Sequence, residues 1–290
     1  MNHTQAPSKK RILVAGPCAA ETPEQIGVSL REAKARGVDF VRISLWKPRT
    51  KPGFDGLKEA GIPLLAQAAQ MGLNPATEIL VPSQAQAVMD GVLPTLPENA
   101  RLMLWIGARN QNHYVQQEIA RVAAADSRVC LMLKNQPWSS ESHWEGILEH
   151  AFEGGMAAEN LFLCHRGFTP ESTDTRGLRN VPNSAMAMRI REKTGVPMLL
   201  DVSHIAGAVD KLAVTAQESV THAYDGMVIE VHPTPRQAWT DASQQITWTE
   251  LDALLESLDQ QSNARSESPI SVSMLGELQS QQTERVSVPV

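Results

Sequence analysis

The sequence has no long apolar run and no excess of positive charge, and each absence excludes a class of protein. No stretch of the 290 residues approaches the ~18 apolar residues that a membrane-spanning helix needs, and no apolar signal core precedes the short run 12–17. The formal net charge of −6 argues against a nucleic-acid-binding protein that relies on bulk positive charge. We therefore expect a soluble cytoplasmic protein that binds neither membranes nor nucleic acids.

Cysteine is scarce, and the three cysteines present, Cys18, Cys130 and Cys164, follow no disulfide spacing. An odd count without such a framework predicts free thiols in a reducing compartment. Cys130 and Cys164 fall in the middle of apolar runs, so we expect them in the core. The sequence also lacks a Gly-x-Gly-x-x-Gly turn after its first apolar run, which argues against a dinucleotide-binding fold.

Short apolar runs of strand length recur along the chain, and amphipathic segments lie between them. The eight runs start 27 to 37 residues apart, at 12–18, 40–46, 73–80, 101–108, 128–135, 160–167, 197–204 and 226–233. Helical patterns are clearest at 23–37, 112–125, 139–155 and 248–258. Apolar strands that alternate with amphipathic helices indicate a parallel sheet covered by helices, and eight such units predict a (β/α)8 TIM barrel. A doubly wound sheet is the alternative.

The composition changes at both ends of this repeating pattern. Residues 11–259 contain all eight strand-helix units, so we assign them to one catalytic barrel. Residues 260–290 are rich in Ser and Gln and have a weak apolar pattern, which predicts a mostly disordered tail. We also expect residues 1–10 to be flexible.

Every predicted strand ends in a charged or metal-binding side chain. The residues at these ends are Cys18, Lys47, Glu78, Arg109, Lys134, Arg166, His204, and Glu230 together with His232. The C-terminal ends of barrel strands meet at one mouth, where active sites of this fold lie. The sequence therefore predicts that these side chains share a single pocket.

Part of this set has the chemistry of a metal site. Cys18, His204 and Glu230, with Asp241 just beyond the last strand, offer mixed sulfur, nitrogen and oxygen ligands that suit a divalent transition metal. None of them has CxxC or HExxH spacing. Taken alone, Cys18 could equally be a buried thiol and His204 a hydrogen-bonded core histidine. Their common position at strand ends is what favours the metal site.

The other part of the set is cationic. The segment WKPRTKPG, residues 46–53, combines three positive charges with two prolines, which predicts a fixed cationic loop. The full cationic group is Arg42, Lys47, Arg49, Lys51, Arg109, Lys134 and Arg166. Several cations in one pocket repel one another unless anions neutralise them, so we expect a ligand with more than one anionic group. Ordinary solvated surface charges are the alternative.

Nine short blocks resemble, in order, those of class I 3-deoxy-D-arabino-heptulosonate 7-phosphate (DAHP) synthases. They lie between residues 15 and 245 and read AGPCAAE, WKPRTKPG, ATE, WIGARN, LKN, HRGF, DVSH, IEVHP and TDASQQ. The resemblance is to the type related to members fused to chorismate mutase. It implies a metal-dependent condensation of phosphoenolpyruvate with erythrose 4-phosphate to DAHP and phosphate, the first step of the shikimate pathway.

The resemblance also implies roles for individual residues. The metal ligands would be Cys18, His204, Glu230 and Asp241, with manganese, iron, cobalt or zinc as the ion. The substrate-binding residues would be Arg42, Lys47, Pro48, Arg49, Thr50, Glu78, Ala108, Arg109, Lys134 and Arg166. Within that set, Pro48, Arg49 and Thr50 would hold the sugar phosphate. Lys47, Lys134 and His204 would take part in catalysis. Two positions depart from the family pattern, Asn135 and His165, where many relatives have Arg and Glu.

Three other functions remain open on the sequence. A 3-deoxy-octulosonate 8-phosphate synthase would use arabinose 5-phosphate, but its relatives carry Ala-Asn-Arg-Ser where this chain has Lys-Pro-Arg-Thr. A Schiff-base aldolase would use Lys47 or Lys134 as its nucleophile and leaves Cys18 and His204 unexplained. A non-catalytic barrel could act as a regulatory subunit. We expect a homo-oligomer, either a dimer or a tetramer. Any feedback control should come from a separate partner, because about 30 residues follow the barrel.

Overall fold

The structure is a computed structural model, and it describes residues 11–49, 52–171, 175 and 177–267. The predicted flexible segment 1–10 lies outside the described residues, as do Thr50, Lys51 and residues 268–290. The chain divides into two units, residues 1–251 and 252–290. The first unit contains all eight strands.

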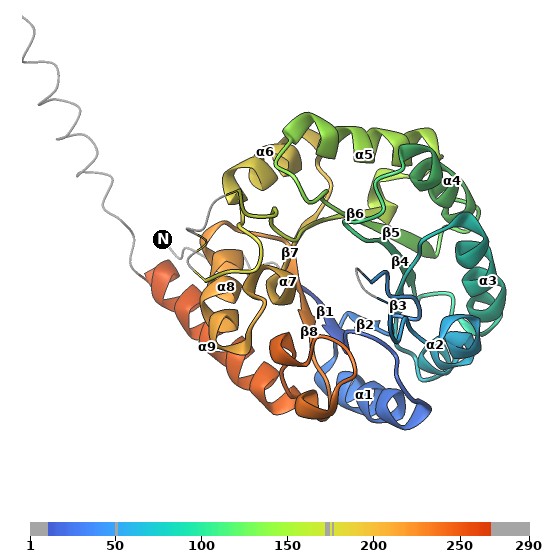
Figure 1. Cartoon of the computed structure of the whole chain (residues 1–290), viewed down its shortest axis with the longest axis horizontal. Coiled ribbons are helices and arrows are strands. Elements are labelled where there is room, and N and C mark those ends of the chain that lie inside the picture. The colour runs from blue at the N-terminus through green and yellow to red at the C-terminus, as the bar shows by residue number, and fades with distance from the viewer. Residues whose placement is uncertain (1–10, 50–51, 172–174, 176, 268–290) are drawn as a thin grey trace, which may run out of the picture. The chain divides into compact units, whose positions relative to one another are not determined.

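Eight parallel strands close into a barrel in chain order (Figure 1). They are β1 (Ile12–Gly16), β2 (Phe40–Arg42), β3 (Pro75–Glu78), β4 (Leu102–Ile106), β5 (Val129–Lys134), β6 (Leu161–His165), β7 (Met198–Asp201) and β8 (Gly226–Glu230). Each strand pairs with the next, and β8 pairs with β1 to complete the ring. The predicted (β/α)8 TIM barrel is therefore confirmed.

Helices follow the strands and surround the barrel (Figure 1). They are α1 (Pro23–Arg36), α2 (Ile62–Gln70), α3 (Pro82–Val92), α4 (His113–Ala123), α5 (Glu141–Glu153), α6 (Ser184–Thr194), α7 (Val202–Ala206) and α8 (Val209–Thr221). The last helix, α9 (Trp248–Glu267), begins in the first unit and continues into the second. Side-chain caps begin several of them: the Thr22 hydroxyl accepts from the Gln25 amide, and Ser140 does the same for His143. All four helices predicted from the sequence are present. No described helix combines the length and apolar character needed to cross a bilayer.

The interior of the barrel is filled by alternate side chains of the strands. The cluster consists of Val14, Phe40, Ala76, Met103, Trp105, Cys130, Met132, Phe162, Cys164, Leu199 and Val228. Cys130 and Cys164 are free and fully buried in it, which confirms their predicted place in the core. The barrel interior is thus a packed core, and in this fold ligands bind at the mouth formed by the C-terminal strand ends.

The structure corrects two predicted boundaries. The run predicted as a strand over 197–204 ends at Asp201, and α7 follows, because the Asp201 carboxylate caps that helix by accepting from the His204 amide at 3.3 Å. At the other end of the chain, α9 continues to Glu267, past the helix end expected at residue 258. No Gly or Pro lies between Trp248 and Glu267 to end the helix.

Candidate active site

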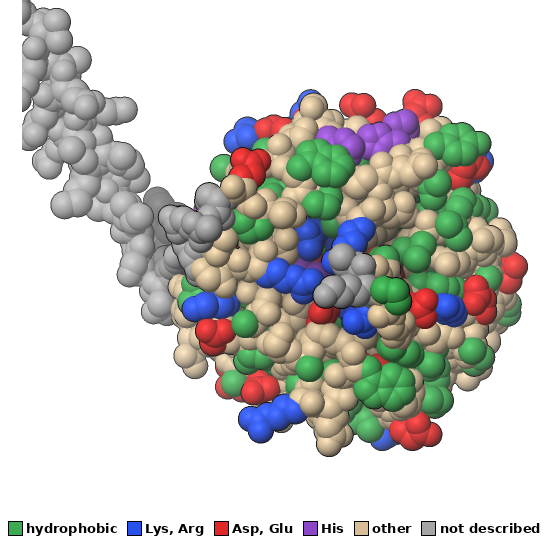
Figure 2. Space-filling model, in the orientation of Figure 1, with side chains coloured by type: hydrophobic (Ala, Val, Ile, Leu, Met, Phe, Trp, Pro, Cys, Tyr) green, Lys and Arg blue, Asp and Glu red, His purple; other side chains and the backbone are tan. Residues whose placement is uncertain are grey.

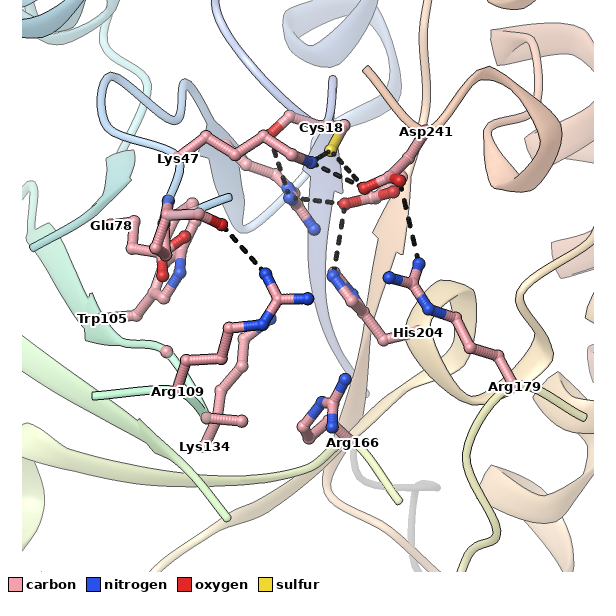
Figure 3. Close-up of a pocket in the computed structure, with 15 residues that line it drawn as sticks. Cys18, Lys47, Glu78, Trp105, Arg109, Lys134, Arg166, Arg179, His204 and Asp241 are labelled. Carbon is pink, nitrogen blue, oxygen red and sulfur yellow. Dashed lines mark hydrogen bonds and ion pairs between the residues drawn. The ribbon is translucent and has the colours of Figure 1, made fainter. Parts of the chain in front are cut away.

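A pocket opens at the C-terminal ends of the strands, and Lys and Arg side chains gather around it (Figure 2). It is lined by Cys18, Arg42, Lys47, Pro48, Glu78, Trp105, Gly107, Ala108, Arg109, Lys134, Arg166, Arg179, His204, Glu230 and Asp241 (Figure 3). Nearly all the residues predicted for the site are therefore together. The sequence reasoning missed Trp105, Gly107 and Arg179.

Three of the four predicted metal ligands form one compact group. Ligand atoms of Cys18, Glu230 and Asp241 all lie within 4.8 Å of one another. The first two meet because β1 and β8 are paired in register, with Gly16 opposite Glu230. Asp241 adopts a left-handed backbone conformation, with φ 43°, which is unusual for a residue with a side chain and typical of functional sites. This donor set, one sulfur and two carboxylates, fits a divalent transition metal.

His204, the fourth predicted ligand, lies beside this group. Its Nε2 is 3.9 Å from Glu230 Oε1, and its Nδ1 is 3.0 Å from Asp201 Oδ1. Burial lowers the pKa of His204, although Asp201 and Glu230 oppose the shift, so the ring is neutral at pH 7. With the Nδ1 hydrogen directed at Asp201, the Nε2 lone pair faces the Glu230 side, as in a histidine metal ligand oriented by a carboxylate.

Two adjacent glutamines hold the ligand group in place. Gln245 Oε1 accepts from the Cys18 backbone amide at 2.9 Å, and Gln244 Nε2 donates to Glu230 Oε2 at 2.6 Å. Both side chains are buried. They explain why the polar block TDASQQ lies in a structured turn, a role that the sequence reasoning did not assign.

Lys47 connects the ligand group to the cationic part of the pocket. Its ammonium group donates to Cys18 Sγ and to Asp241 Oδ2, the latter at 2.6 Å (Figure 3). Burial and the nearby Glu230 raise the pKa of the Cys18 thiol well above its usual value, so Cys18 is protonated in this arrangement. Burial also acts to raise the pKa of Asp241, but Lys47 and Arg179 together lower it. A metal bound here would have to displace the thiol proton.

Arg42 and Lys134 are buried cations at the base of the pocket. Arg42 is only 2 % exposed; its NH2 donates to Glu230 at 3.0 Å, while its Nε and NH1 have no partner in the described part of the chain. Burial acts to lower the pKa of Lys134, but Asp201, 2.6 Å away, raises it overall. Both cations lie near the Trp105 ring, at 5.3 and 5.8 Å from its centroid. Buried donors without a partner indicate an anion-binding site.

Three further arginines line the mouth of the pocket. Arg109 donates to the Pro48 carbonyl at 2.9 Å, which ties the β4–α4 loop to the cationic loop. Burial and the neighbouring arginines lower the pKa of Arg166. Arg179 donates to Gln244 at 2.7 Å and lies 3.8 Å from Asp241. It comes from the long β6–α6 connection and is far in sequence from any strand end, so the strand-end pattern could not identify it.

Glu78 lies against Gly107, and this contact explains the glycine. A Cβ atom at position 107 would be 2.1 Å from Glu78 Oε1. Burial raises the pKa of Glu78, although Lys134 and Lys47 act against the rise. A side chain at position 107 would therefore displace a buried carboxyl group from the wall of the pocket.

Arg49 does not line the pocket, in contrast to Lys47 and Pro48 of the same loop. Its side chain is exposed, and its NH1 donates to the Phe54 carbonyl at 3.1 Å. Thr50, the other residue predicted to bind the sugar phosphate, lies outside the described residues. Their assignment stays a prediction.

The two departures from the family pattern lie outside the pocket. His165 packs on the Trp144 ring, 5.3 Å between centroids, and its Nε2 accepts from the Asn183 amide at 2.9 Å. Burial lowers the pKa of His165 to about 3, so the ring is neutral. The Asn135 side chain donates to Gly167 and accepts from the Arg166 amide. Asn135 therefore acts on the pocket only through the backbone of Arg166.

Comparisons with known proteins find a family model and relatives with two enzyme names. The model of the "DAHP synthetase I family" matches residues 5–267. The phospho-2-dehydro-3-deoxyheptonate aldolase of Thermotoga maritima is 26% identical over 254 residues, 87% of this chain and 70% of that protein. A solved structure of the DAHP synthase from the same organism has 25% identity and a TM-score of 0.77, covering 89% of this chain and 71% of that one. The 2-dehydro-3-deoxyphosphooctonate aldolase of Bordetella petrii is also 26% identical, over 85% of this chain and 88% of its own length.

Proposed function

The chain belongs to the DAHP synthetase I family, and from this membership and the pocket we infer that it condenses phosphoenolpyruvate with erythrose 4-phosphate. The products are DAHP and inorganic phosphate, and the reaction opens the shikimate pathway of aromatic amino acid biosynthesis. The observation that carries this function is the presence of a metal-type donor set and six cationic side chains in a single pocket. Among the described residues, three carboxylates line the same pocket and Asp201 pairs with Lys134 beneath it. These four acidic groups are fewer than the six cations, and two phosphorylated substrates would supply the missing negative charge.

We propose that phosphoenolpyruvate binds on the cationic side. The unpartnered guanidinium nitrogens of Arg42 and the ammonium of Lys134 can hold its carboxylate and phosphate from below. Arg109 and Arg166 can bind the phosphate from the rim, where they stabilise the charge that develops as phosphate leaves. Glu78 and the backbone of Ala108 complete this side of the pocket.

Cys18, His204, Glu230 and Asp241 are proposed to hold the divalent ion, with manganese, iron, cobalt and zinc as the candidates. When bound, the ion polarises the aldehyde oxygen of erythrose 4-phosphate and makes its carbon electrophilic. Lys47 lies between the two halves of the pocket and can contact phosphoenolpyruvate. Pro48, Arg49 and Thr50 then remain for the phosphate of the sugar.

The bond changes follow from this arrangement. The enol carbon of phosphoenolpyruvate forms a carbon–carbon bond to the aldehyde carbon, and water adds to the carbon that bears the phosphate. Phosphate departs with the bridging oxygen, so a C–O bond breaks and the P–O bonds stay intact. The attacking water loses both of its protons as its oxygen becomes the carbonyl oxygen of DAHP. The aldehyde oxygen gains one of these protons and the departing phosphate gains the other. Lys47, Lys134 and His204 are the side chains in reach that can carry these protons.

A phosphate-release assay tests the function directly. Purified protein is given phosphoenolpyruvate with either erythrose 4-phosphate or arabinose 5-phosphate, each with and without a chelator. We expect metal-dependent release with the four-carbon sugar and at least tenfold less with the five-carbon sugar. Preference for arabinose 5-phosphate would favour the octulosonate 8-phosphate reaction, which the name of the Bordetella petrii relative makes the second candidate. No turnover with either sugar would favour a non-catalytic barrel.

We further propose a cytoplasmic location, in keeping with free cysteines and a biosynthetic reaction. A dimer or tetramer, and control by a separate regulatory partner, also stay predictions. Size-exclusion chromatography with light scattering tests the oligomeric state.

A further inference from the structure

Histidines gather on the outer surface of the barrel, over α4 and α5 (Figure 2). His113 begins α4 and His143 lies in the first turn of α5, and their Nε2 atoms are 3.3 Å apart. His150 lies two turns further along α5, and its ring centroid is 4.8 Å from that of His113. None of these residues lines the active-site pocket.

The separation of the two Nε2 atoms is that of two ligands on one metal ion. Nitrogen ligands bound at about 2.0–2.1 Å in a tetrahedral site lie roughly 3.3–3.4 Å from each other. A third ligand atom is close, because Gln111 Oε1 is 2.9 Å from His143 Nε2. His113, His143 and Gln111 thus direct two imidazole nitrogens and one amide oxygen at the same region.

Hydrogen bonding alone does not satisfy this arrangement. The Nε2 atom of His143 carries either one hydrogen or one lone pair, yet it faces both His113 Nε2 and Gln111 Oε1. One of these two contacts must therefore be weak, whereas a cation accepts electron pairs from all three atoms. Burial lowers the pKa of both His113 and His143, and the neighbouring histidines lower that of His113 further. Both rings are neutral at pH 7, the form that binds metals.

We propose that His113 Nε2, His143 Nε2 and Gln111 Oε1 form a second site for a divalent transition metal of the zinc type. The site is separate from the Cys18 group, with water completing the coordination. It joins the β4–α4 loop to the start of α5.

The site is coupled to the active-site pocket through Gln111. The Gln111 side chain directs Oε1 at His143, and its Nε2 donates to the Ala108 carbonyl at 2.8 Å. Ala108 and Arg109 both line the pocket. A metal on Oε1 would therefore fix the loop that presents Arg109. This coupling rests on the proposed function, in which Arg109 binds the phosphate of phosphoenolpyruvate, whereas the metal site itself does not.

Zinc binding to the metal-free protein tests the site by stoichiometry. In a calorimetric titration with Zn²⁺ alone, the native protein should bind two equivalents. Cys18→Ser should weaken one of them, and His143→Ala should weaken the other at least tenfold. His113→Ala should match His143→Ala, which guards against a folding defect in either variant. His222→Ala is the matched control, because His222 is exposed and pairs with Glu218 instead, and it should keep both equivalents.

Unchanged zinc stoichiometry and affinity in both His113→Ala and His143→Ala would overturn the site. Coupling is measured separately, as the KM for phosphoenolpyruvate in protein carrying only the Cys18-group ion, before and after Zn²⁺ addition. We expect the KM to change at least twofold in the native protein and to stay constant in His143→Ala. A constant KM in the native protein would refute the coupling. If the native protein binds zinc as expected but shows no turnover, the result would count against the proposed function and not against the metal site.

Discussion

Asp201→Asn tests whether the buried carboxylate beneath the pocket orients His204, a proposed metal ligand. Asp201 is fully buried; it binds the Lys134 ammonium at 2.6 Å and His204 Nδ1 at 3.0 Å, and it caps α7. Asparagine has nearly the same shape, so the cavity is unchanged. What the substitution removes is the negative charge and one of the two acceptor oxygens.

The magnitude follows from these contacts. Removing one partner of a buried ion pair leaves the other charge uncompensated, which costs about 3–5 kcal/mol of the free energy of unfolding. The pKa of Lys134 is now raised by Asp201, and the lysine would relieve part of the cost by losing its proton. Loss of the carboxylate behind a histidine ligand typically lowers metal affinity by about 10–100-fold. We therefore expect the unfolding free energy to fall by at least about 2 kcal/mol, which is less than the full cost because Lys134 can lose its proton. We also expect a clear loss of metal affinity.

Two measurements are needed, urea unfolding of the metal-free protein and a metal titration followed by calorimetry. The control is Glu141→Gln, which breaks an exposed ion pair with Arg189 at 2.6 Å and should cost no more than about 1 kcal/mol. Asp201→Asn should lose more unfolding free energy than this control and be the only one of the two to weaken metal binding. Equal stability losses, together with unchanged metal affinity, would show that Asp201 neither compensates Lys134 nor orients His204.

Three other substitutions give separate tests. Cys18→Ser should lower metal affinity at least tenfold, because a hydroxyl replaces the sulfur ligand. Metal content after dialysis measures this, and a variant that retains as much metal as the native protein would show that Cys18 is not a ligand. Arg49→Ala should raise the KM for erythrose 4-phosphate several-fold more than the KM for phosphoenolpyruvate, and equal effects on both constants would contradict its assignment to the sugar phosphate. Gly107→Ala should reduce kcat/KM and cost about 1–3 kcal/mol in unfolding free energy, because the new Cβ would clash with Glu78 Oε1. The control is Gly146→Ala inside α5, where a Cβ meets nothing closer than 4.0 Å and the substitution should be neutral or stabilising. Full activity of Gly107→Ala would show that Glu78 can move without consequence.

The fold could be predicted because the signals for it are local. Most strands are short apolar runs buried on both faces, and the helices between them carry apolar stripes, several with a side-chain cap, so eight repeats of this pattern determine the barrel. The strand-end rule then brought residues as distant in sequence as Cys18 and Glu230 into one pocket. It succeeded because parallel strands deliver their C-terminal ends to the same side.

The residues that sequence reasoning missed have no such local signal. Arg179 reaches the pocket from a long connection, and its position depends on the path of that connection, where its amide donates to the Ile205 carbonyl. Asp201 looked like an ordinary strand residue, because its role as helix cap and partner of Lys134 depends on where β7 ends. Gly107 matters only because the Glu78 side chain lies against it. In each case the role depends on a contact between separate segments of the chain, and the periodicity of apolar residues carries no information about such contacts.

The two halves of the pocket lie on different sides of the barrel mouth, and this division constrains how the substrates lie. The metal-type ligands come from the segment after β1, from α7, from the end of β8 and from the turn after β8. On the other side, Arg109, Lys134 and Arg166 lie at or just beyond the ends of β4, β5 and β6. An aldehyde activated on the first side can meet the enol carbon only if phosphoenolpyruvate lies with its charged groups toward the second. Lys47 stands at the boundary, where its ammonium donates to the Cys18 thiol and compensates the charge of Asp241. Pro48 restricts the backbone next to Lys47, which favours a lysine ammonium held between the two proposed substrate positions.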